Sequence, residues 1–247
     1  MSQDDDKSPF NWDNWPFIIP DCDPDGPREE ETSNSSSVRF KEQALRLNAE
    51  IGLVSSQLEL GLNLLFGKDG FTKDPQEAVQ WLGAAAERGD AEARYYLGGC
   101  LRFGIGCKQN LKRAVELFRA AAKQGHTGAL NNLGYCLRHG LGCKQNTEKA
   151  VRIYRILAKR GDAGGKNNYG SCLEKGIGCE KNIDKAFRLY RAAAKQGDHN
   201  GQFNLADCYE KGNGCRKNLA KARFWYRKAA EQGCKEAQEA LRRLKDN

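Results

Sequence analysis

The chain repeats its own pattern every 36 residues, and this period limits its fold more strictly than any other feature. Glycine and alanine mark the same two places in five successive units, at Gly89, Gly125, Gly161, Gly197 and Gly233 and at Ala78, Ala114, Ala150, Ala186 and Ala222. A fixed period of this length is typical of solenoids, in which each unit buries its apolar face against its neighbours. We therefore expect a solenoid.

Each unit has the pattern of two helices. Within residues 90–125, Ala93 and Leu97 begin an apolar stripe at helical spacing, and a Gly-Ile-Gly loop ends this first helix. Asn110 is a suitable N-cap for the second helix, and Gly125 is expected to end it in the left-handed conformation.

The two ends of the repeated region have the pattern of caps. Residues 40–52 read as a lone second helix, and residues 234–247 read as a lone first helix with a charged outer side. The first full unit follows the same pattern with Asp74 as N-cap, although its loop is out of step by one residue. Solenoids need such caps to remain soluble.

The net charge is divided unevenly along the chain. Residues 1–37 hold ten acidic residues against Lys7 and Arg28, a net charge of −8. Of the chain's 40 basic and 32 acidic residues, the other 38 and 22 lie in residues 38–247, which gives that region a net charge of +16. The sequence therefore predicts an acidic tail, residues 1–37, joined to a basic repeat domain, residues 38–247.

The tail is rich in Pro, Asp, Ser and Asn, a composition typical of disorder. It also contains the stretch FNWDNWPFII, whose aromatic residues suggest a short docking motif: Phe10, Trp12, Trp15 and Phe17. The alternative is that this segment packs on the repeats of its own chain.

The repeated residues are an Ala, a Leu-Gly pair, a Gly-x-Gly loop, an Asn or Asp, a second Ala, a Tyr or Phe, and an Ala-Ala pair. This pattern resembles the Sel1-like repeat, a relative of the tetratricopeptide repeat, over about residues 53–247. The resemblance implies an all-α fold, a right-handed α-α solenoid of about five Sel1-like repeats plus capping helices. In two departures, Gly164 and Gly165 weaken the start of one first helix, and Ala206 replaces a glycine.

Four repeats carry a pair of cysteines seven residues apart, and the members are Cys100 and Cys107, Cys136 and Cys143, Cys172 and Cys179, and Cys208 and Cys215. The Gly-x-Gly loop allows each second cysteine to turn back toward the first. The pairs are either reduced thiols that fill the core or disulfides within a repeat, each contributing about 2.5 kcal/mol. The first repeat is expected to place Leu64 and Phe71 there, which favours apolar filling. Relatives rich in cysteine use one disulfide per repeat with a different spacing. Metal ligation is disfavoured, because no histidine or second pair has zinc spacing.

The sequence predicts no enzyme, cofactor or metal site. The three histidines fall at unrelated places in their repeats and read as surface substitutions. The chain has no Ser-x-x-Lys, Gly-x-Ser-x-Gly or P-loop motif.

Similarity to tetratricopeptide repeats implies a concave face lined by the first helices. The residues expected to contact a partner there are Tyr95, Arg102, Phe103, Asn131, Tyr135, Arg138, Asn167, Lys175, Phe203 and Lys211. Asn, Tyr and Arg suit a groove that holds an extended or acidic peptide. Residues 1–37 of the same chain are a second candidate occupant.

We therefore expect a monomeric, non-enzymatic scaffold or adaptor that binds a protein partner. The basic charge is spread around the repeats, which disfavours nucleic acid. No signal peptide or membrane segment is evident, so the expected location is the cytoplasm or nucleus. The alternative is a disulfide-stapled secreted or imported repeat protein, to which family analogy would add a β-lactamase or penicillin-binding activity.

Overall fold

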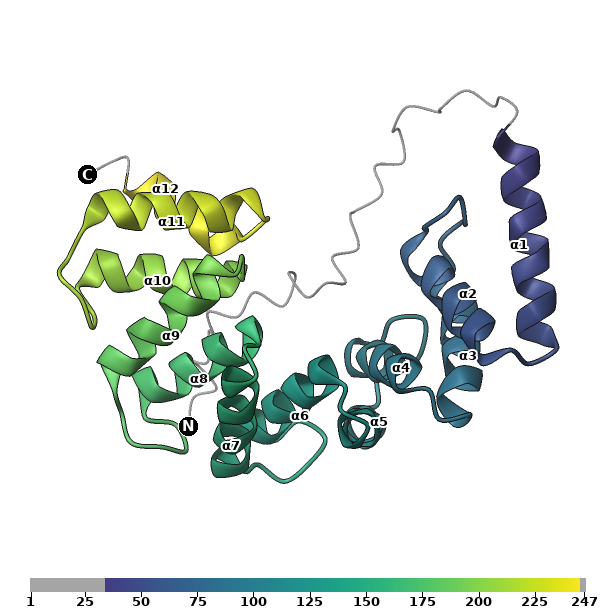
Figure 1. The fold of residues 1–247 in the computed structure, drawn as a ribbon, viewed down its shortest axis with the longest axis horizontal. Coiled ribbons are helices and arrows are strands. Elements are labelled where there is room, and N and C mark those ends of the chain that lie inside the picture. The colour runs from purple at the N-terminus through teal and green to yellow at the C-terminus, as the bar shows by residue number, and fades with distance from the viewer. Residues whose placement is uncertain (1–33, 245–247) are drawn as a thin grey trace. The chain divides into compact units, whose positions relative to one another are not determined.

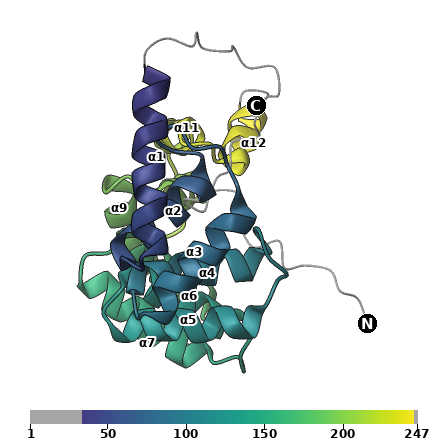
Figure 2. The same ribbon diagram turned by 90° about the vertical axis from the view of Figure 1, so that its right-hand side faces the viewer.

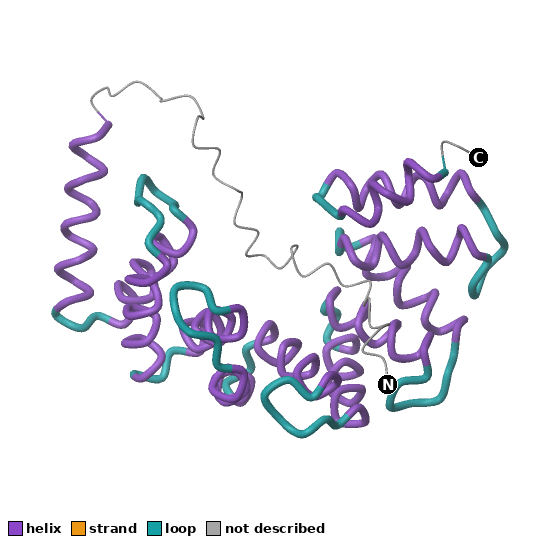
Figure 3. The backbone as a smooth tube through the Cα atoms, turned by 180° about the vertical axis from the view of Figure 1, so that it is seen from behind, coloured by secondary structure: helices purple, strands orange, loops and turns teal. Residues whose placement is uncertain are grey.

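The computed structural model describes residues 34–244, whose regular structure is entirely helical (Figures 1 and 3). The described residues divide into two compact units, residues 34–145 and residues 146–244. The first unit contains α1 (Asn34–Glu50), α2 (Val54–Phe66), α3 (Pro75–Glu87), α4 (Ala91–Phe103), α5 (Leu111–Lys123) and α6 (Thr127–His139). The second contains α7 (Thr147–Lys159), α8 (Ala163–Lys175), α9 (Ile183–Lys195), α10 (His199–Lys211), α11 (Leu219–Glu231) and α12 (Lys235–Arg243).

Within each unit, every helix packs against the next helix in sequence. The closest partners are the two helices of one repeat, such as α4 with α5 and α10 with α11. Each first helix also packs on the second helix before it, as α4 does on α3. The expected α-α solenoid is confirmed, with α1 beside α2 at one end (Figures 1 and 2) and α12 on α11 at the other.

Side-chain caps begin the second helices, as the sequence predicts. The side chain of Asp74 accepts hydrogen bonds from the backbone N–H groups of Gln76 and Glu77, and Pro75 occupies the first turn of α3. The side chain of Asn110 accepts from the backbone N–H of Arg113 at the start of α5. These bonds satisfy donors that an α-helix leaves unpaired at its N-terminus.

The two helices of a repeat approach closely because a glycine of the first lies beneath an aromatic ring of the second. A Cβ added at Gly98 would lie 2.7 Å from the ring of Phe118, and one added at Gly170 would lie 2.8 Å from the ring of Tyr190. Ala206 takes this place in the last repeat, where it is fully buried in the same cluster as Tyr226.

The second glycine of each Gly-x-Gly loop forms the joint between neighbouring repeats. It has a left-handed φ of 66–67° and lies on the first turn of the preceding repeat's second helix. The four contacts are Gly106 on Pro75, Gly142 on Leu111, Gly178 on Thr147 and Gly214 on Ile183. A side chain at any of these glycines would meet backbone atoms, which cannot move aside as a flexible side chain can.

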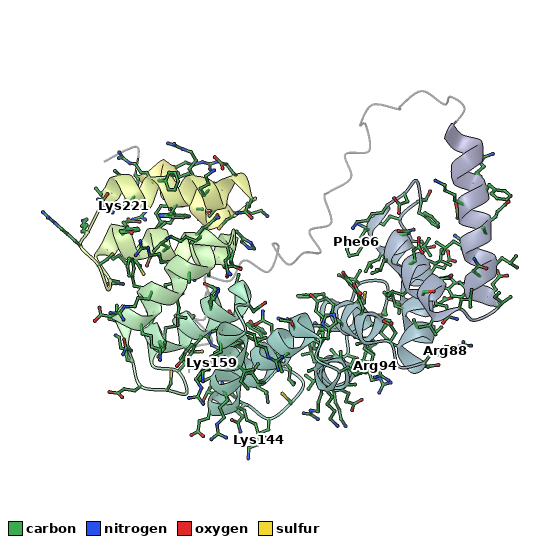
Figure 4. All side chains as sticks on the ribbon, in the orientation of Figure 1. Phe66, Arg88, Arg94, Lys144, Lys159 and Lys221 are labelled. Carbon is green, nitrogen blue, oxygen red and sulfur yellow. The ribbon has the colours of Figure 1, made fainter. Side chains whose placement is uncertain are left out.

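A second joint connects the far ends of the second helices. Arg88, at the end of α3 (Figure 4), donates a hydrogen bond to the carbonyl of Gly52. Thirty-six residues later, Gln124 Nε2 donates to Gly89 O at 2.9 Å. The period thus brings a long polar side chain to the terminal glycine of the previous repeat.

The N-terminal helix differs from the prediction in its starting point. α1 begins at Asn34, four residues before the domain boundary expected at residue 38, so Asn34–Ser37 are helical. Asn and Ser favour the first positions of a helix, which is consistent with this start. The predicted docking motif, Phe10 to Phe17, lies outside the described residues.

The joint at Gly142 can be tested against Gly125, which also has a left-handed φ but where an added Cβ would have no neighbouring atom within 4 Å. Gly125→Ala should cost about 1–2 kcal/mol of unfolding free energy, the cost of a left-handed alanine. Gly142→Ala should cost about 1–3 kcal/mol more, because the helix backbone at Leu111 must also shift. Equal urea midpoints for the two variants would contradict the assignment of Gly142 as a joint.

Candidate protein-interaction face

The first helices of the repeats, α2, α4 and α6, form one face of residues 34–145, which we call its first-helix face. This face is organised around Arg102, in the last turn of α4. Its Nη1 donates a hydrogen bond to Asn132 Oδ1 on α6 at 3.1 Å. Its guanidinium carbon lies 4.5 Å from the ring centre of Tyr135 and 4.8 Å from that of Phe103. The ring of Tyr135 lies 4.2 Å from that of His139. We call Phe103, Arg102, Tyr135 and His139 the cation–aromatic stack, which joins two neighbouring repeats.

The loop after α4 holds the last turn of this helix in place. Gln109 Nε2 donates to the carbonyl of Arg102 at 2.7 Å, and the backbone N–H of Asn110 donates to the carbonyl of Leu101 at 2.8 Å. Gln145 repeats the first of these bonds on Arg138, also at 2.7 Å. Because the loop closes back on the helix, the backbone beneath the stack is fixed before a partner binds.

A second group of aromatic rings lies on the same unit. The ring of Tyr95 is 4.6 Å from that of His126 in a stacked arrangement, and 5.1 Å from that of Tyr96. Phe66, at the end of α2 (Figure 4), lies 6.0 Å from Tyr96. Burial raises the pKa of Tyr95 well above its ordinary value, so its hydroxyl stays protonated and can act as a hydrogen-bond donor.

The ten predicted contact residues differ in their exposure to solvent. Arg102, Arg138 and Asn167 are buried, with 4%, 7% and 1% of their surface exposed, so they support the face rather than project from it. Phe103, Lys175 and Lys211 are exposed. The remaining four are half-buried, namely Tyr95, Asn131, Tyr135 and Phe203.

On the first-helix face of residues 146–244, two charged positions have the opposite sign. The positions that hold Arg102 and Arg138 in the first unit hold Glu174 and Glu210 here. Tyr190 and Tyr226 donate their hydroxyl protons to these two carboxylates, each at 2.8 Å. The predicted contact residue Lys211 is paired with Asp207 at 2.8 Å. The two groups of predicted residues therefore belong to faces of different chemistry.

The cysteine pairs lie at the hinge of each repeat. The carbonyl of Cys100 accepts the backbone N–H groups of Gly104 and Ile105, at 2.8 and 3.0 Å, so it closes the helix end. Cys100 is buried and Cys107 is half-buried; burial and, to a lesser extent, the neighbouring Cys107 thiol raise the pKa of Cys100. Among residues 34–244, no disulfide joins two cysteines in this structure.

The first repeat corrects one expectation about these positions. Asn63, rather than Leu64, occupies the place of the first cysteine, because its carbonyl accepts the N–H of the terminal glycine, Gly67. Phe71 takes the place of the second cysteine, as expected, and both residues are buried. One of the two hinge positions therefore accepts a polar side chain.

Among residues 34–244, no three His, Cys, Asp or Glu side chains gather as metal ligands would.

His126 has a role that the sequence interpretation missed. Its Nδ1 accepts the backbone N–H of Ala129 at 3.1 Å, so it is the N-cap of α6 and not a neutral surface substitution. Asp90, Asp162 and Asp198 cap the equivalent helices. The shared position of these aspartates was the signal that could have identified the cap.

The Sel1 repeat family model matches residues 54–90, 91–126, 127–162, 164–198 and 199–234. A Sel1 repeat protein from Oxalobacter formigenes is 30% identical and superposes with a TM-score of 0.72, over 85% of this chain and 87% of that one. A protective antigen with an SLR fold from uropathogenic Escherichia coli is 28% identical, with a TM-score of 0.57 over 81% of this chain and 50% of that one.

A curated mouse (Mus musculus) protein, DAP3-binding cell death enhancer 1, is 40% identical over 67 residues. The match spans 27% of this chain and 12% of the mouse protein, so most of the relative's length has no counterpart here. Within residues 34–244, no helix is both long and apolar enough to span a bilayer.

The two thiols of a pair should differ in reactivity when the protein is reduced. Burial raises the pKa of Cys100 to about 12 and that of Cys136 to about 11, which suppresses their thiolates at pH 8. In timed alkylation followed by mass spectrometry, Cys107 and Cys143 should therefore be labelled before Cys100 and Cys136. Equal labelling rates would contradict the burial described here. Repeating the labelling without reductant reports whether each pair is oxidised.

The His126 cap should make the stability of α6 depend on pH. Burial lowers the pKa of His126, and Nδ1 must be unprotonated to accept a hydrogen bond. Because the folded pKa is below the unfolded value of about 6.5, the cap stabilises fully above pH 6.5 and loses its effect as the pH falls through the folded pKa.

The matched variant is His126→Asp, which restores the cap of the other repeats. Between pH 7.5 and 5.5 the wild type should lose about 0.5–1 kcal/mol of unfolding free energy relative to this variant, the scale of a lost N-cap. Urea unfolding at the two pH values measures the difference. Parallel pH profiles would show that the His126 cap does not titrate.

Proposed function

Because the chain belongs to the Sel1 repeat family, we propose that it is a non-enzymatic scaffold or adaptor that binds a protein partner. The proposed docking surface is the first-helix face of residues 34–145. The partner segment is extended and acidic. Repeat solenoids present such faces without catalytic groups, and their function depends on the residues that each face displays.

The observation that carries this proposal is the cation–aromatic stack. Its rings are only partly covered, since Phe103 is 36% exposed and Tyr135 is half-buried. The stack is also fixed before binding, because Arg102 is held by Asn132 and by two rings. A rigid aromatic surface loses little conformational entropy on association, which is typical of interface centres.

The charge of the face supports an acidic partner. Arg102 and Arg138 are both buried beneath it, and His139 ends the stack beside Tyr135. Buried cations below a partly apolar surface create a positive potential that water screens weakly. Carboxylates of a docked segment would be attracted to this potential, while its backbone and apolar side chains contact the rings.

The proposal also includes the cellular compartment of the protein and the redox state of its cysteine pairs. We place the protein in the cytoplasm or nucleus, where the cysteine pairs would remain reduced. Buried, weakly ionised thiols such as Cys100 and Cys136 support this part of the proposal, because they pack as small apolar side chains.

Site-specific photocrosslinking tests the docking surface. A benzophenone amino acid at Phe103 should form a bond to a second protein, and the bonded peptide should be rich in Asp and Glu. The matched control is the same amino acid at Phe224, an exposed aromatic position on the second helix α11, where no such bond is expected.

The stack itself is tested by Tyr135→Leu, which keeps an apolar side chain but removes the ring over Arg102. This variant should reduce the Phe103 crosslink several-fold, since a hot-spot aromatic contributes about 2 kcal/mol or more. The proposal fails if Phe224 captures the same peptide, or if Tyr135→Leu leaves the yield at Phe103 unchanged.

A further inference from the structure

A second surface of different geometry lies at the loop edge of residues 146–244. A pocket of about 530 Å³ is formed by α9, the last turn of α10, the loop after α10 and the start of α11. Its lining residues are Phe187, Arg191, Tyr209, Cys215, Arg216, Lys217, Asn218 and Lys221. Four of these eight residues are cations, and none is acidic. We call it the basic edge pocket.

The four cations of this pocket are available to a ligand. Arg191, Arg216, Lys217 and Lys221 are all exposed, and none of them forms an ion pair with a carboxylate in the described part of the chain. Lys221, at the start of α11 (Figure 4), has its Nζ 5.4 Å from the ring centre of Tyr209. The pocket therefore combines concentrated positive charge with an aromatic surface.

The floor of the pocket is a pair of aromatic rings. Phe187 and Tyr209 meet edge to face, with ring centres 5.5 Å apart. Both are half-buried, so part of each ring remains in contact with solvent. The loop above them is held close because Gly214 has no side chain: a Cβ there would lie 2.9 Å from the Cβ of Phe187.

This combination does not occur at the equivalent positions of the other repeats. Where the last repeat has Phe187 and Tyr209, the preceding ones have Val151 with Leu173 and Val115 with Leu137. Lys181 and Lys217 stand where the earlier repeats have Gln109 and Gln145, whose side chains close their own loops on Arg102 and Arg138 at 2.7 Å. The last two repeats thus share a lysine in place of a loop-closing amide, and the two aromatic rings distinguish the pocket of the last repeat.

We propose that the basic edge pocket binds residues 10–31 of the same chain. That segment has the complementary chemistry: Phe and Trp side chains in residues 10–17, followed by six acidic residues between Asp21 and Glu31. The aromatic part would rest on Phe187 and Tyr209, and the acidic part would meet the four cations.

The chain length limits how far each part of the segment can reach. The aromatic residues 10–17 lie 17 to 24 residues before Asn34, so at about 3.3 Å per residue an extended chain lets them reach roughly 55–80 Å from the start of α1. The acidic residues 21–31 lie 3 to 13 residues before Asn34 and reach about 10–43 Å from it, so the contact forms where the pocket lies within that distance of α1. This interaction is separate from the docking surface on residues 34–145, so the two proposals can succeed or fail independently.

Zero-length crosslinking of the full chain tests the contact directly. A carbodiimide joins a carboxylate to a lysine amine only when the two groups touch. In dilute protein at low salt, mass spectrometry should find residues 21–31 joined to Lys217 or Lys221, and high salt should suppress these bonds. Mixing heavy and light isotope-labelled protein should give bonds only within one chain.

Two variants test which side chains of the pocket hold the N-terminal segment. Arg216→Glu leaves both acceptor lysines in place and should lower the yield about three- to tenfold, the effect of exchanging one exposed attraction for a repulsion. Its control is Lys144→Glu, the same charge reversal at the equivalent loop position of another repeat (Figure 4), which should leave the yield unchanged. Tyr209→Leu restores the residue of the other repeats and should also lower the yield.

Four outcomes would overturn the proposal. The first is bonds spread over lysines throughout the repeats, and the second is equal loss of yield in Arg216→Glu and Lys144→Glu. Bonds between heavy and light chains would show association of two copies instead. A single-stranded oligonucleotide that photocrosslinks to Tyr209, with no bond from the tail to Lys217 or Lys221, would assign the pocket to nucleic acid.

Discussion

The contact between a loop glycine and the preceding repeat is the constraint on which the rest of the structure depends. Gly106, Gly142, Gly178 and Gly214 each press on the first turn of an earlier second helix with no space for a side chain. The same glycines have the left-handed φ that turns the loop back after a first helix. One residue type therefore both reverses the chain and sets the distance between repeats. The carbonyls of the first hinge cysteines, Cys100 and its equivalents, accept backbone N–H groups from the start of the same loop.

The joint fixes the register of the first helices, and the register decides which side chains become neighbours. Position 102 of one repeat meets position 132 of the next, which allows Arg102 to bond to Asn132 and to lie against Tyr135. The same scaffold presents Glu174 and Glu210 in the second unit, where tyrosine hydroxyls satisfy the carboxylates. An unchanged backbone thus accepts opposite charges at equivalent positions, because the solenoid constrains only the residues at its joints and in its core.

The repeat, its caps and its left-handed glycines were predictable from the sequence, because a 36-residue period repeats local signals such as Asn110 and Gly125. Tyr95, Arg102 and Tyr135 were placed on the correct helices for the same reason. The reversal of charge at Glu174 is visible in the sequence, at the repeat position of Arg102 and Arg138. Burial of Arg102 could not be read along one repeat, since it depends on contacts between repeats. The His126 cap was missed because its residue type differs from the aspartates that share its position, although the position itself identified its role.

The most direct test of this account asks whether the joint positions the interaction face. The signal of a fluorinated Tyr135 in the full chain can be compared among the wild type, Gly142→Ala, Gly125→Ala and Arg102→Lys. If the joint sets the register, Gly142→Ala should move the Tyr135 signal in the direction that Arg102→Lys does, and Gly125→Ala should leave it in place. An unchanged Tyr135 signal in a folded Gly142→Ala protein would contradict the claim that the glycine joint assembles the face.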